Sequence, residues 1–374
     1  MSDRIKVVLD VGGQWTRAGF AGESFPRAEY PSVVGRFRRT ELLDGFPDVY
    51  CGREAVLKRG ISLLSWPMQK GLIQDWDELE KLLHHTFYKE LLVAPEETNV
   101  MYALHPLTPG KDKEQMAELL FETFIVDAIY LAQSPALVTL ASGRTTGLVW
   151  ENGYSCCYTA PVFEGFPLKH SIVTSQLTGQ AITGILLDLM KNIGYSFTTP
   201  TEIELAEKIK ASTCYVATDL KSIQASRMAD GDTKVRYQLP DGQHIILDEE
   251  RFICPEVFFR PSLQGLECPS IVDDICKTIS RCDIDYQPMF YDNIVLSGGG
   301  SQLAGLDKRL HRELLLRVLE QPNFRVTVDA MESRQHATWR GGSMLACMDA
   351  VKGCYLTKEE YEDSGTGRVR QKFY

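Results

Sequence analysis

The stretch IKVVLDVGGQWTRAGF, residues 5–20, predicts a β-hairpin with glycines at its tip. Ile5 to Leu9 is a continuous apolar run of strand length, and Asp10-Val11-Gly12-Gly13 follows it as a tight turn. Trp15 to Phe20 can then return as a second strand. The tip of this hairpin therefore carries an acid and glycines at one point.

The same arrangement returns later in the chain. Thr145 to Trp150 is predicted as a strand, Glu151-x-Gly153 follows as the turn, and Cys156 to Ala160 can pair back. Two hairpins of this kind, separated by a large part of the chain, indicate a duplicated domain with a cleft between the copies.

The composition is that of an ordinary globular protein. At 374 residues the chain is longer than one hydrophobic core usually supports, so we expect two lobes or domains. Hydrophobic residues make up 44% and charged residues 24% of the sequence, which shows no bias toward disorder. The formal net charge of −10 argues against a nucleic-acid partner, because neutralising phosphates requires a basic face.

The sequence also limits location and metal chemistry. It starts without an apolar segment of signal-peptide length and has no transmembrane run, so we expect a cytoplasmic protein without membrane insertion. The ten cysteines are scattered, and the adjacent pair Cys156-Cys157 has poor geometry for a disulfide or a zinc site. Reduced thiols are expected, without a metal site made of side-chain nitrogen or sulfur.

Two amphipathic helices are predicted between the hairpins. One starts at the capping acid Asp75, with Glu78 three residues later and an apolar stripe beyond. The other runs from about Lys113 to Ala132. We interpret both stripes as core.

Residues Arg36 to Tyr50 lack helix or strand periodicity and are predicted to form a surface loop. Leu42, Leu43 and Phe46 lie in it. Apolar residues in such a loop indicate a contact with another molecule, or a loop folded onto its own lobe.

Two glycine runs are predicted to precede helices. Ser297-Gly298-Gly299-Gly300 follows a strand and precedes a helix from about Leu303 to Leu319, which lets backbone N–H groups approach an anion or a planar ring. Plain turn chemistry is the alternative. Trp339-Arg340-Gly341-Gly342-Ser343 is placed before a helix at Met344 to Ala350.

Several motifs resemble the actin family. Ala141-Ser142-Gly143-Arg144-Thr145-Thr146-Gly147 is similar to the actin motif around the second phosphate loop. Further similar motifs follow in actin order along the whole chain: Arg17-Ala18-Gly19-Phe20-Ala21-Gly22, His84-His85-Thr86-Phe87-Tyr88, Val93-Ala94-Pro95-Glu96-Glu97, Gly194-Tyr195-Ser196-Phe197-Thr198-Thr199, Cys214-Tyr215-Val216-Ala217, Cys254-Pro255-Glu256 and Thr357-Lys358-x-Glu360-Tyr361.

The resemblance implies an α/β actin fold, as in the actin, hexokinase and heat-shock ATPase superfamily. Such a fold has two lobes with a duplicated core and four subdomains around a nucleotide cleft. The implied subdomains are 1–31, 67–141 and 337–374 for the first, 32–66 with the partner-contacting loop 36–50 for the second, 142–177 and 267–336 for the third, and 178–266 for the fourth.

The resemblance also implies that the chain binds ATP or ADP with Mg²⁺ or Ca²⁺. Asp10 and Glu151 would hold the cation through water, and Arg17 stands where the family usually has a phosphate-binding lysine. The remaining implied nucleotide-binding positions are Gly12, Gly13, Gln14, Trp15, Gly153, Tyr154, Ser155, Lys210, Gly298, Gly299, Gly300, Leu303 and Gln335.

Several of these positions depart from the family pattern. Gly13 replaces a serine whose hydroxyl meets the terminal phosphate, and Tyr154 replaces an aspartate. Ser134 and Tyr158 replace the glutamine and the histidine near the attacking water, so no catalytic residue is assigned. Such groups are typically worth about 10²–10⁴ in rate, which predicts very slow or absent hydrolysis.

An apolar partner groove is implied as well. Its residues would be Leu140, Gly143, Thr145, Phe166, Leu345 and Met348. The implied partners are further copies of the chain in a head-to-tail filament and proteins of the actin-binding type. The alternative is that these residues merely cover the core.

Three functions stay open on the sequence alone. The first is an ATP-binding cytoskeletal protein, with very slow or absent hydrolysis, that acts through self-assembly or partner binding. The second is a nucleotide-free pseudo-actin that serves as an interaction module or filament cap. The third is a functional actin-like ATPase.

Overall fold

The computed structural model describes residues 4–37, 48–219, 234–319 and 324–373. The chain divides into two compact units, as its length predicted: Met1–Thr145, Val162–Lys169 and His336–Tyr374 form the first, and Thr146–Pro161 and His170–Gln335 form the second. Within the segment 142–177, residues 142–145 and 162–169 group with the first unit, and residues 146–161 and 170–177 group with the second. The finer division into four subdomains stays a prediction.

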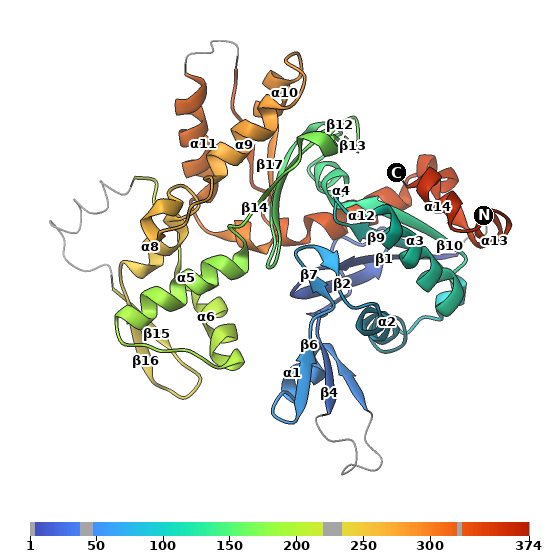
Figure 1. Ribbon diagram of the computed structural model, residues 1–374, viewed down its shortest axis with the longest axis horizontal. Coiled ribbons are helices and arrows are strands. Elements are labelled where there is room, and N and C mark those ends of the chain that lie inside the picture. Colours follow the sequence, from blue (N-terminus) through green and yellow to red (C-terminus); the bar gives the residue numbers. More distant parts are fainter. Residues whose placement is uncertain (1–3, 38–47, 220–233, 320–323, 374) are drawn as a thin grey trace. The chain divides into compact units, whose positions relative to one another are not determined.

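A mixed sheet organises the first unit (Figure 1). Its strands are β1 (Ile5–Val11), β2 (Trp15–Phe20), β3 (Ala28–Pro31), β9 (Thr98–Leu104), β10 (Ala128–Gln133) and β19 (Leu356–Thr357). They lie in the order β19-β10-β9-β1-β2-β3. The predicted hairpin is confirmed, because β1 pairs antiparallel with β2, while β9 pairs parallel with both β1 and β10.

Side chains on both faces of this sheet are buried. The helices of the unit are α1 (Gly52–Leu57), α2 (Trp76–His85), α3 (Gly110–Glu118), α4 (Ser134–Ala141), α12 (Ala337–Cys347), α13 (Lys358–Ser364) and α14 (Gly367–Lys372). In β1, Val7 and Leu9 join the buried cluster that holds the apolar side chains of α2 and α3. Val8 joins the cluster of Leu137 and Trp339 instead. The apolar run at the start of the chain is therefore a strand covered on both sides.

The helix at Asp75 is confirmed. The Asp75 side chain accepts a hydrogen bond from the Glu78 backbone N–H and caps α2. Leu79, Leu82 and Leu83 of its apolar stripe are fully buried.

The single helix predicted from Lys113 to Ala132 is wrong in its second half. α3 ends at Glu118, a π-helical turn covers Leu119–Thr123, and β10 begins at Ala128. Ile125 has a φ of +56°, a left-handed conformation that cannot continue a helix. Ile129 is buried as predicted, but it lies in the strand β10 and not in a helix.

The predicted loop 36–50 is wrong at both ends. Arg36 lies in β4 (Val34–Phe37) and Tyr50 in β5 (Val49–Cys51), and the two strands pair antiparallel. Tyr50 is buried in a small core and its ring contacts Phe37, which explains why both ends are ordered. Leu42, Leu43 and Phe46 lie outside the described residues. The nearby strands β6 (Ser62–Ser65), β7 (Met68–Gln69) and β8 (Leu72–Ile73) also belong to the first unit.

The glycines at 339–343 do not precede a helix, contrary to prediction, but lie inside α12. α12 packs against α4, and an ideal Cβ at Gly341 would lie 1.9 Å from the carbonyl oxygen of Leu137. Glycine is needed here for close helix packing and not for a turn. Trp339, two residues before Gly341 and fully buried, donates its indole N–H to the Val8 carbonyl at 3.0 Å.

A second sheet organises the second unit. Its strands are β11 (Gly147–Asn152), β12 (Cys157–Phe163), β14 (Val173–Ser175), β17 (Ile294–Ser297) and β18 (Val328–Asp329). The order is β12-β11-β17-β18, with β14 paired to β12. The predicted strand pair is thus confirmed, although its first strand begins at Gly147 and not at Thr145. The last residues of β12 belong to the first unit, where they pair with β13 (Phe166–Pro167).

Helices and one further hairpin complete the second unit. They are α5 (Gly179–Asn192), α6 (Pro200–Thr213), β15 (Val235–Gln238), β16 (His244–Leu247), α8 (Glu250–Glu256), α9 (Ile271–Ser280), α10 (Gln287–Tyr291) and α11 (Leu306–Val318). The glycine run after β17 leads into a 3₁₀ turn, Gly299–Gln302, so the helix predicted from Leu303 starts at Leu306.

Asp274 on α9 gives the second unit a pH-dependent stability. It is buried, and burial raises its pKa from the ordinary 3.8 to about 6, although Ser175 hydrogen-bonds to it. Between these two values the native state keeps a proton that the unfolded chain has lost, so the free energy of unfolding falls as pH rises. Asp274→Asn is expected to remove this slope and to stabilise the protein by about 2 kcal/mol at pH 7.5.

Denaturant unfolding at pH 4.5 and pH 7.5 measures this effect. The exposed Asp188→Asn substitution on α5 serves as the control and should change stability little at either pH. An Asp274→Asn variant that is destabilised equally at both pH values would contradict the prediction.

Candidate functional site

Three charged side chains lie in register across the first hairpin and the strand beside it. Asp10 on β1 is opposite Arg17 on β2, and Arg17 is opposite Glu29 on β3. Arg17 Nε donates to Glu29 Oε1 at 2.9 Å, and an Arg17 terminal nitrogen lies 3.6 Å from Asp10 Oδ2. The residue predicted to bind phosphate is therefore held between two carboxylates.

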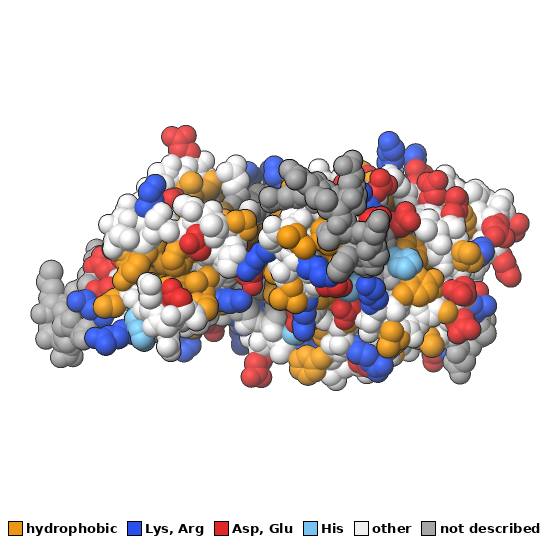
Figure 2. Space-filling view, turned by 90° about the horizontal axis from the view of Figure 1, so that it is seen from below, with side chains coloured by type: hydrophobic (Ala, Val, Ile, Leu, Met, Phe, Trp, Pro, Cys, Tyr) orange, Lys and Arg blue, Asp and Glu red, His pale blue; other side chains and the backbone are white. Residues whose placement is uncertain are grey.

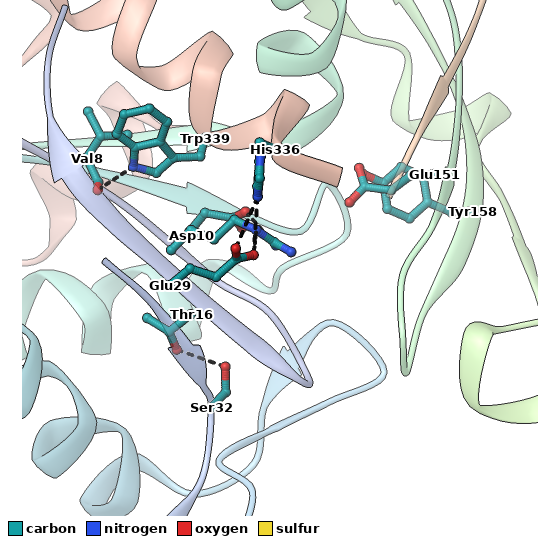
Figure 3. Close-up of polar contacts among 10 residues, drawn as sticks. Val8, Asp10, Thr16, Glu29, Ser32, Glu151, Tyr158, His336 and Trp339 are labelled. Carbon is teal, nitrogen blue, oxygen red and sulfur yellow. Dashed lines mark hydrogen bonds and ion pairs between the residues drawn. The ribbon is translucent and has the colours of Figure 1, made fainter. Parts of the chain in front are cut away.

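A fourth group, His336, joins this cluster from the start of α12 (Figure 3). Its Nε2 lies 3.3 Å from both carboxylate oxygens of Glu29. The hydrogen bond from His336, together with the Arg17 charge, holds the pKa of Glu29 below its ordinary value. Burial raises the pKa of Asp10, and the Arg17 charge opposes that rise only in part.

Sequence reasoning missed Glu29 and His336. Glu29 alternates with the buried Ala28 and Tyr30, which is a strand signal, but only the register of β3 against β2 places it beside Arg17. His336 is distant in sequence, so no local pattern could have found it.

Backbone hydrogen bonds fix the tip of the first hairpin. Gly12 N–H donates to the Trp15 carbonyl at 3.0 Å, and the Gln14 carbonyl accepts from Ser32 N–H at 2.9 Å. Gly13, which brings no hydroxyl, and Trp15, which is partly exposed, complete the tip.

In the second unit, Tyr158 on β12 contacts Glu151 on β11. The buried phenol donates to Glu151 Oε2 at 2.5 Å (Figure 3). A carboxylate oxygen that accepts this hydrogen bond is less available to order the water shell of a cation.

Tyr154 contacts α6 from the turn between β11 and β12. Its hydroxyl is hydrogen-bonded to Glu207, and burial raises its pKa. The turn is also tied to α5, since Gly179 N–H donates to the Gly153 carbonyl at 2.9 Å. Ser155 Oγ is buried and has no hydrogen-bond partner among the residues the structure describes.

Lys210 on α6, one of the implied nucleotide-binding positions, links α6 to α5. Its ammonium donates to the Gly179 carbonyl at 2.6 Å and to Thr183 Oγ1 at 2.8 Å. Burial lowers its pKa, and these two oxygens supply part of the hydration that it loses.

The glycine run after β17 packs against β11. An ideal Cβ at Gly298 would lie 2.3 Å from the Asn152 carbonyl oxygen, and one at Gly300 would lie 1.8 Å from Asn152 Oδ1. Gly299 is exposed and has open space around it. Gly298 and Gly300 are thus needed for packing, and Gly299 is the most exposed of the three.

The last two predicted positions near this run make internal contacts. Leu303 is buried. The side-chain amides of Gln335 and Gln302 are hydrogen-bonded to each other. Both predicted residues can therefore contribute apolar surface or an amide oxygen, but neither brings a charge.

Ser134, which stands at the position of the water-orienting glutamine, lies with Gln133 at the junction of β10 and α4. Gln133 is the last residue of β10, whereas Ser134 is the first residue of α4 and is buried. Because one residue ends a strand and the next starts a helix, their side chains leave the backbone in different directions.

The predicted groove residues all belong to the first unit. α4, which carries Leu140, packs on both β13 and α12. Phe166 is 64% exposed and Met348 39% exposed, while Leu345 is half-buried. Gly143 and Thr145 are exposed in the loop after α4. Met344, which the sequence did not single out, is also exposed on α12.

Each unit offers one predicted carboxylate that could support a bound cation. In the first unit this carboxylate is Asp10, which forms an ion pair with Arg17. In the second unit it is Glu151, which accepts a hydrogen bond from Tyr158. Within the described residues there is no cluster of three or more His, Cys, Asp and Glu side chains that could hold a metal ion directly. The residues present fit a cation held through water, and they fit it less well than a set of unpaired carboxylates would.

The surface charge is mixed. On the face in Figure 2, acidic and basic side chains are intermixed, with small hydrophobic groups between them. Among the described residues, every helix is too short or too polar to span a bilayer.

Comparison with known families agrees with the motifs in the sequence. The family model described as Actin matches residues 2–374, essentially the whole chain. The mixed α/β units with their separate sheets fit an actin-type fold. This chain belongs to the actin family.

Proposed function

We propose that this actin-family chain acts through self-assembly or partner binding, and that it binds ATP or ADP with Mg²⁺ or Ca²⁺ while hydrolysing ATP very slowly or not at all. The observation that carries the proposal is the hydrogen bond from Tyr158 to Glu151. Tyr158 stands at the histidine position near the attacking water, and here it engages the predicted cation carboxylate.

The loss of hydrolysis follows from what these side chains can do. A buried tyrosine at neutral pH is a poor general base, because burial disfavours its charged form. Tyr154 brings a phenol where the family has a carboxylate, and that phenol is bonded to Glu207. Neither of these two phenols is therefore matched to activating water.

Retained nucleotide binding rests on the groups that persist. Arg17 can bind phosphate, and the half-buried Gly12 and Gly13 bring no side chain to the hairpin tip. When bound, the cation would neutralise phosphate charge, with Asp10 and Glu151 as the carboxylates that support its water shell. This chain's own residues would orient the nucleotide and would not activate water.

A nucleotide-free pseudo-actin is the second candidate. It is favoured by the double pairing of Arg17, which already has two carboxylate partners. In this case the chain would serve as an interaction module or filament cap.

One experiment separates these functions. With millimolar Mg-ATP we expect the melting temperature to rise by a few degrees, because a ligand at about 100 Kd stabilises the native state by about 2.7 kcal/mol. Phosphate release should stay at the level of the protein-free control. AMP with EDTA is the matched ligand control and should shift the melting temperature much less.

Two other outcomes are informative. Saturable phosphate release would show a working ATPase and overturn the proposal. If Mg-ATP leaves the melting temperature unchanged and denaturing the purified protein releases no nucleotide, the chain is nucleotide-free.

For assembly, we propose cytoplasmic, cytoskeletal contacts through the apolar surface of α4, β13 and α12. Phe166 and Met348 are its exposed anchors. Sedimentation across salt and nucleotide conditions tests self-assembly, and a monomer under every condition would leave partner proteins as the only ligands of this surface.

A further inference from the structure

Arg17 has two acidic partners of unequal exposure. The Asp10 side chain is 17% exposed and the Glu29 side chain 35% exposed, while Arg17 itself is 13% exposed. The shorter contact is the one to Glu29, at 2.9 Å against 3.6 Å for Asp10. Glu29 is therefore both the stronger partner of Arg17 and the one that solvent or a ligand can reach.

The cluster opposes an incoming polyphosphate. Two carboxylates, Asp10 and Glu29, lie within 4 Å of the one guanidinium of Arg17, so an anion that approaches Arg17 is repelled by both. A phosphate oxygen can bond to the inner Nε face of Arg17 only by replacing the Glu29 carboxylate, because both are acceptors for the same N–H.

Glu29 would keep a partner after such a replacement. His336 Nε2 lies 3.3 Å from each of its oxygens, on the same unit and independent of Arg17. The carboxylate can thus leave Arg17 without becoming an unpaired, partly buried charge, which lowers the cost of the exchange.

We propose that Glu29 determines the phosphate affinity of the first hairpin by competing for Arg17, with His336 holding the carboxylate that a polyphosphate displaces. This inference rests on the proposed function, since it assumes that Arg17 is a phosphate ligand. It assigns Glu29 an inhibitory role in a ligand exchange that involves no covalent step.

The test is calorimetric titration of the full chain with Mg-ATP and, separately, with inorganic tripolyphosphate. Glu29→Gln is expected to tighten binding of both ligands about tenfold, the size of one charge-assisted bond. Arg17→Gln should weaken binding of both. The double variant Glu29→Gln/Arg17→Gln should bind no more tightly than Arg17→Gln alone.

Glu114→Gln is the matched control. Glu114 on α3 also forms an ion pair with an arginine, Arg370 on α14. This pair belongs to the same unit and contains no residue of the hairpin. Glu114→Gln should leave both affinities unchanged. Glu29→Asp keeps the charge on a shorter side chain and should also tighten binding. It replaces Glu29→Gln in the test if Glu29→Gln does not fold.

The outcomes separate the inference from the proposed function. If the unmodified chain binds Mg-ATP and Glu29→Gln binds no more tightly, the inference is overturned and nucleotide binding stands. If only Glu29→Gln binds, the inference stands and the unmodified chain is nucleotide-free. A gain that persists without Arg17, or no binding by either protein, also overturns the inference.

Discussion

Replacing Gly341 by alanine is expected to destabilise the first unit by about 3 kcal/mol or more, because the added methyl has no space. An ideal Cβ there would lie 1.9 Å from the Leu137 carbonyl oxygen and 2.5 Å from its carbon. These are backbone atoms of α4, so no rotamer change relieves the overlap and α12 has to move away from α4. Denaturant unfolding followed by circular dichroism measures the loss.

Gly184→Ala is the matched control for this substitution. Gly184 also lies inside a helix, α5, but has no atom within 4 Å of an added Cβ. Alanine there should stabilise the protein by about 0.5–1 kcal/mol through helix propensity. Equal effects of the two substitutions would show that packing of α12 on α4 is not what requires glycine at 341.

Arg309→Met is expected to destabilise the second unit by about 3 kcal/mol, because it leaves the buried Glu256 carboxylate with a single, more distant cation, Arg260 at 3.7 Å. Glu256 on α8 is fully buried, and its two oxygens lie 3.1 and 3.3 Å from the terminal nitrogens of Arg309 on α11. Arg309 also donates to the Ala217 carbonyl at 2.7 Å. One guanidinium therefore satisfies both an acid and a carbonyl in the interior.

The loss should depend on pH in a definite direction. Burial raises the pKa of Glu256, and Arg309 opposes that rise. Without Arg309 the carboxyl should hold its proton at higher pH than the unfolded chain does, so the variant gains relative stability as pH falls toward 5. The destabilisation by Arg309→Met is thus expected to be larger at pH 7.5 than at pH 5.

A double-mutant cycle checks the cause. Glu256→Leu/Arg309→Met removes both charges and should recover much of the stability that Arg309→Met loses. If the double variant is as unstable as the sum of the two single variants, the ion pair is not the source of the effect.

Local patterns predicted the elements whose signals lie in neighbouring residues. The β1–β2 hairpin follows from an apolar run, a glycine turn and a return strand, and α2 follows from Asp75 and its apolar stripe. The prediction failed over 113–132, where a buried parallel strand and a helix have equally apolar sequences. Family membership was also readable from sequence, because its motifs are contiguous.

The tertiary structure alone decided which charged groups meet. Arg17 was identified as a candidate phosphate ligand from its position in a motif, but its neighbours Glu29 and His336 come from strand register and from the start of α12. The role of Gly341 likewise depends on α4, which is far away in the sequence. Sequence by itself determined the family, the paired hairpins and the altered side chains. Only the folded chain determined what those side chains bind, because hydrogen bonds and close packing depend on distances in space and not on separation along the chain.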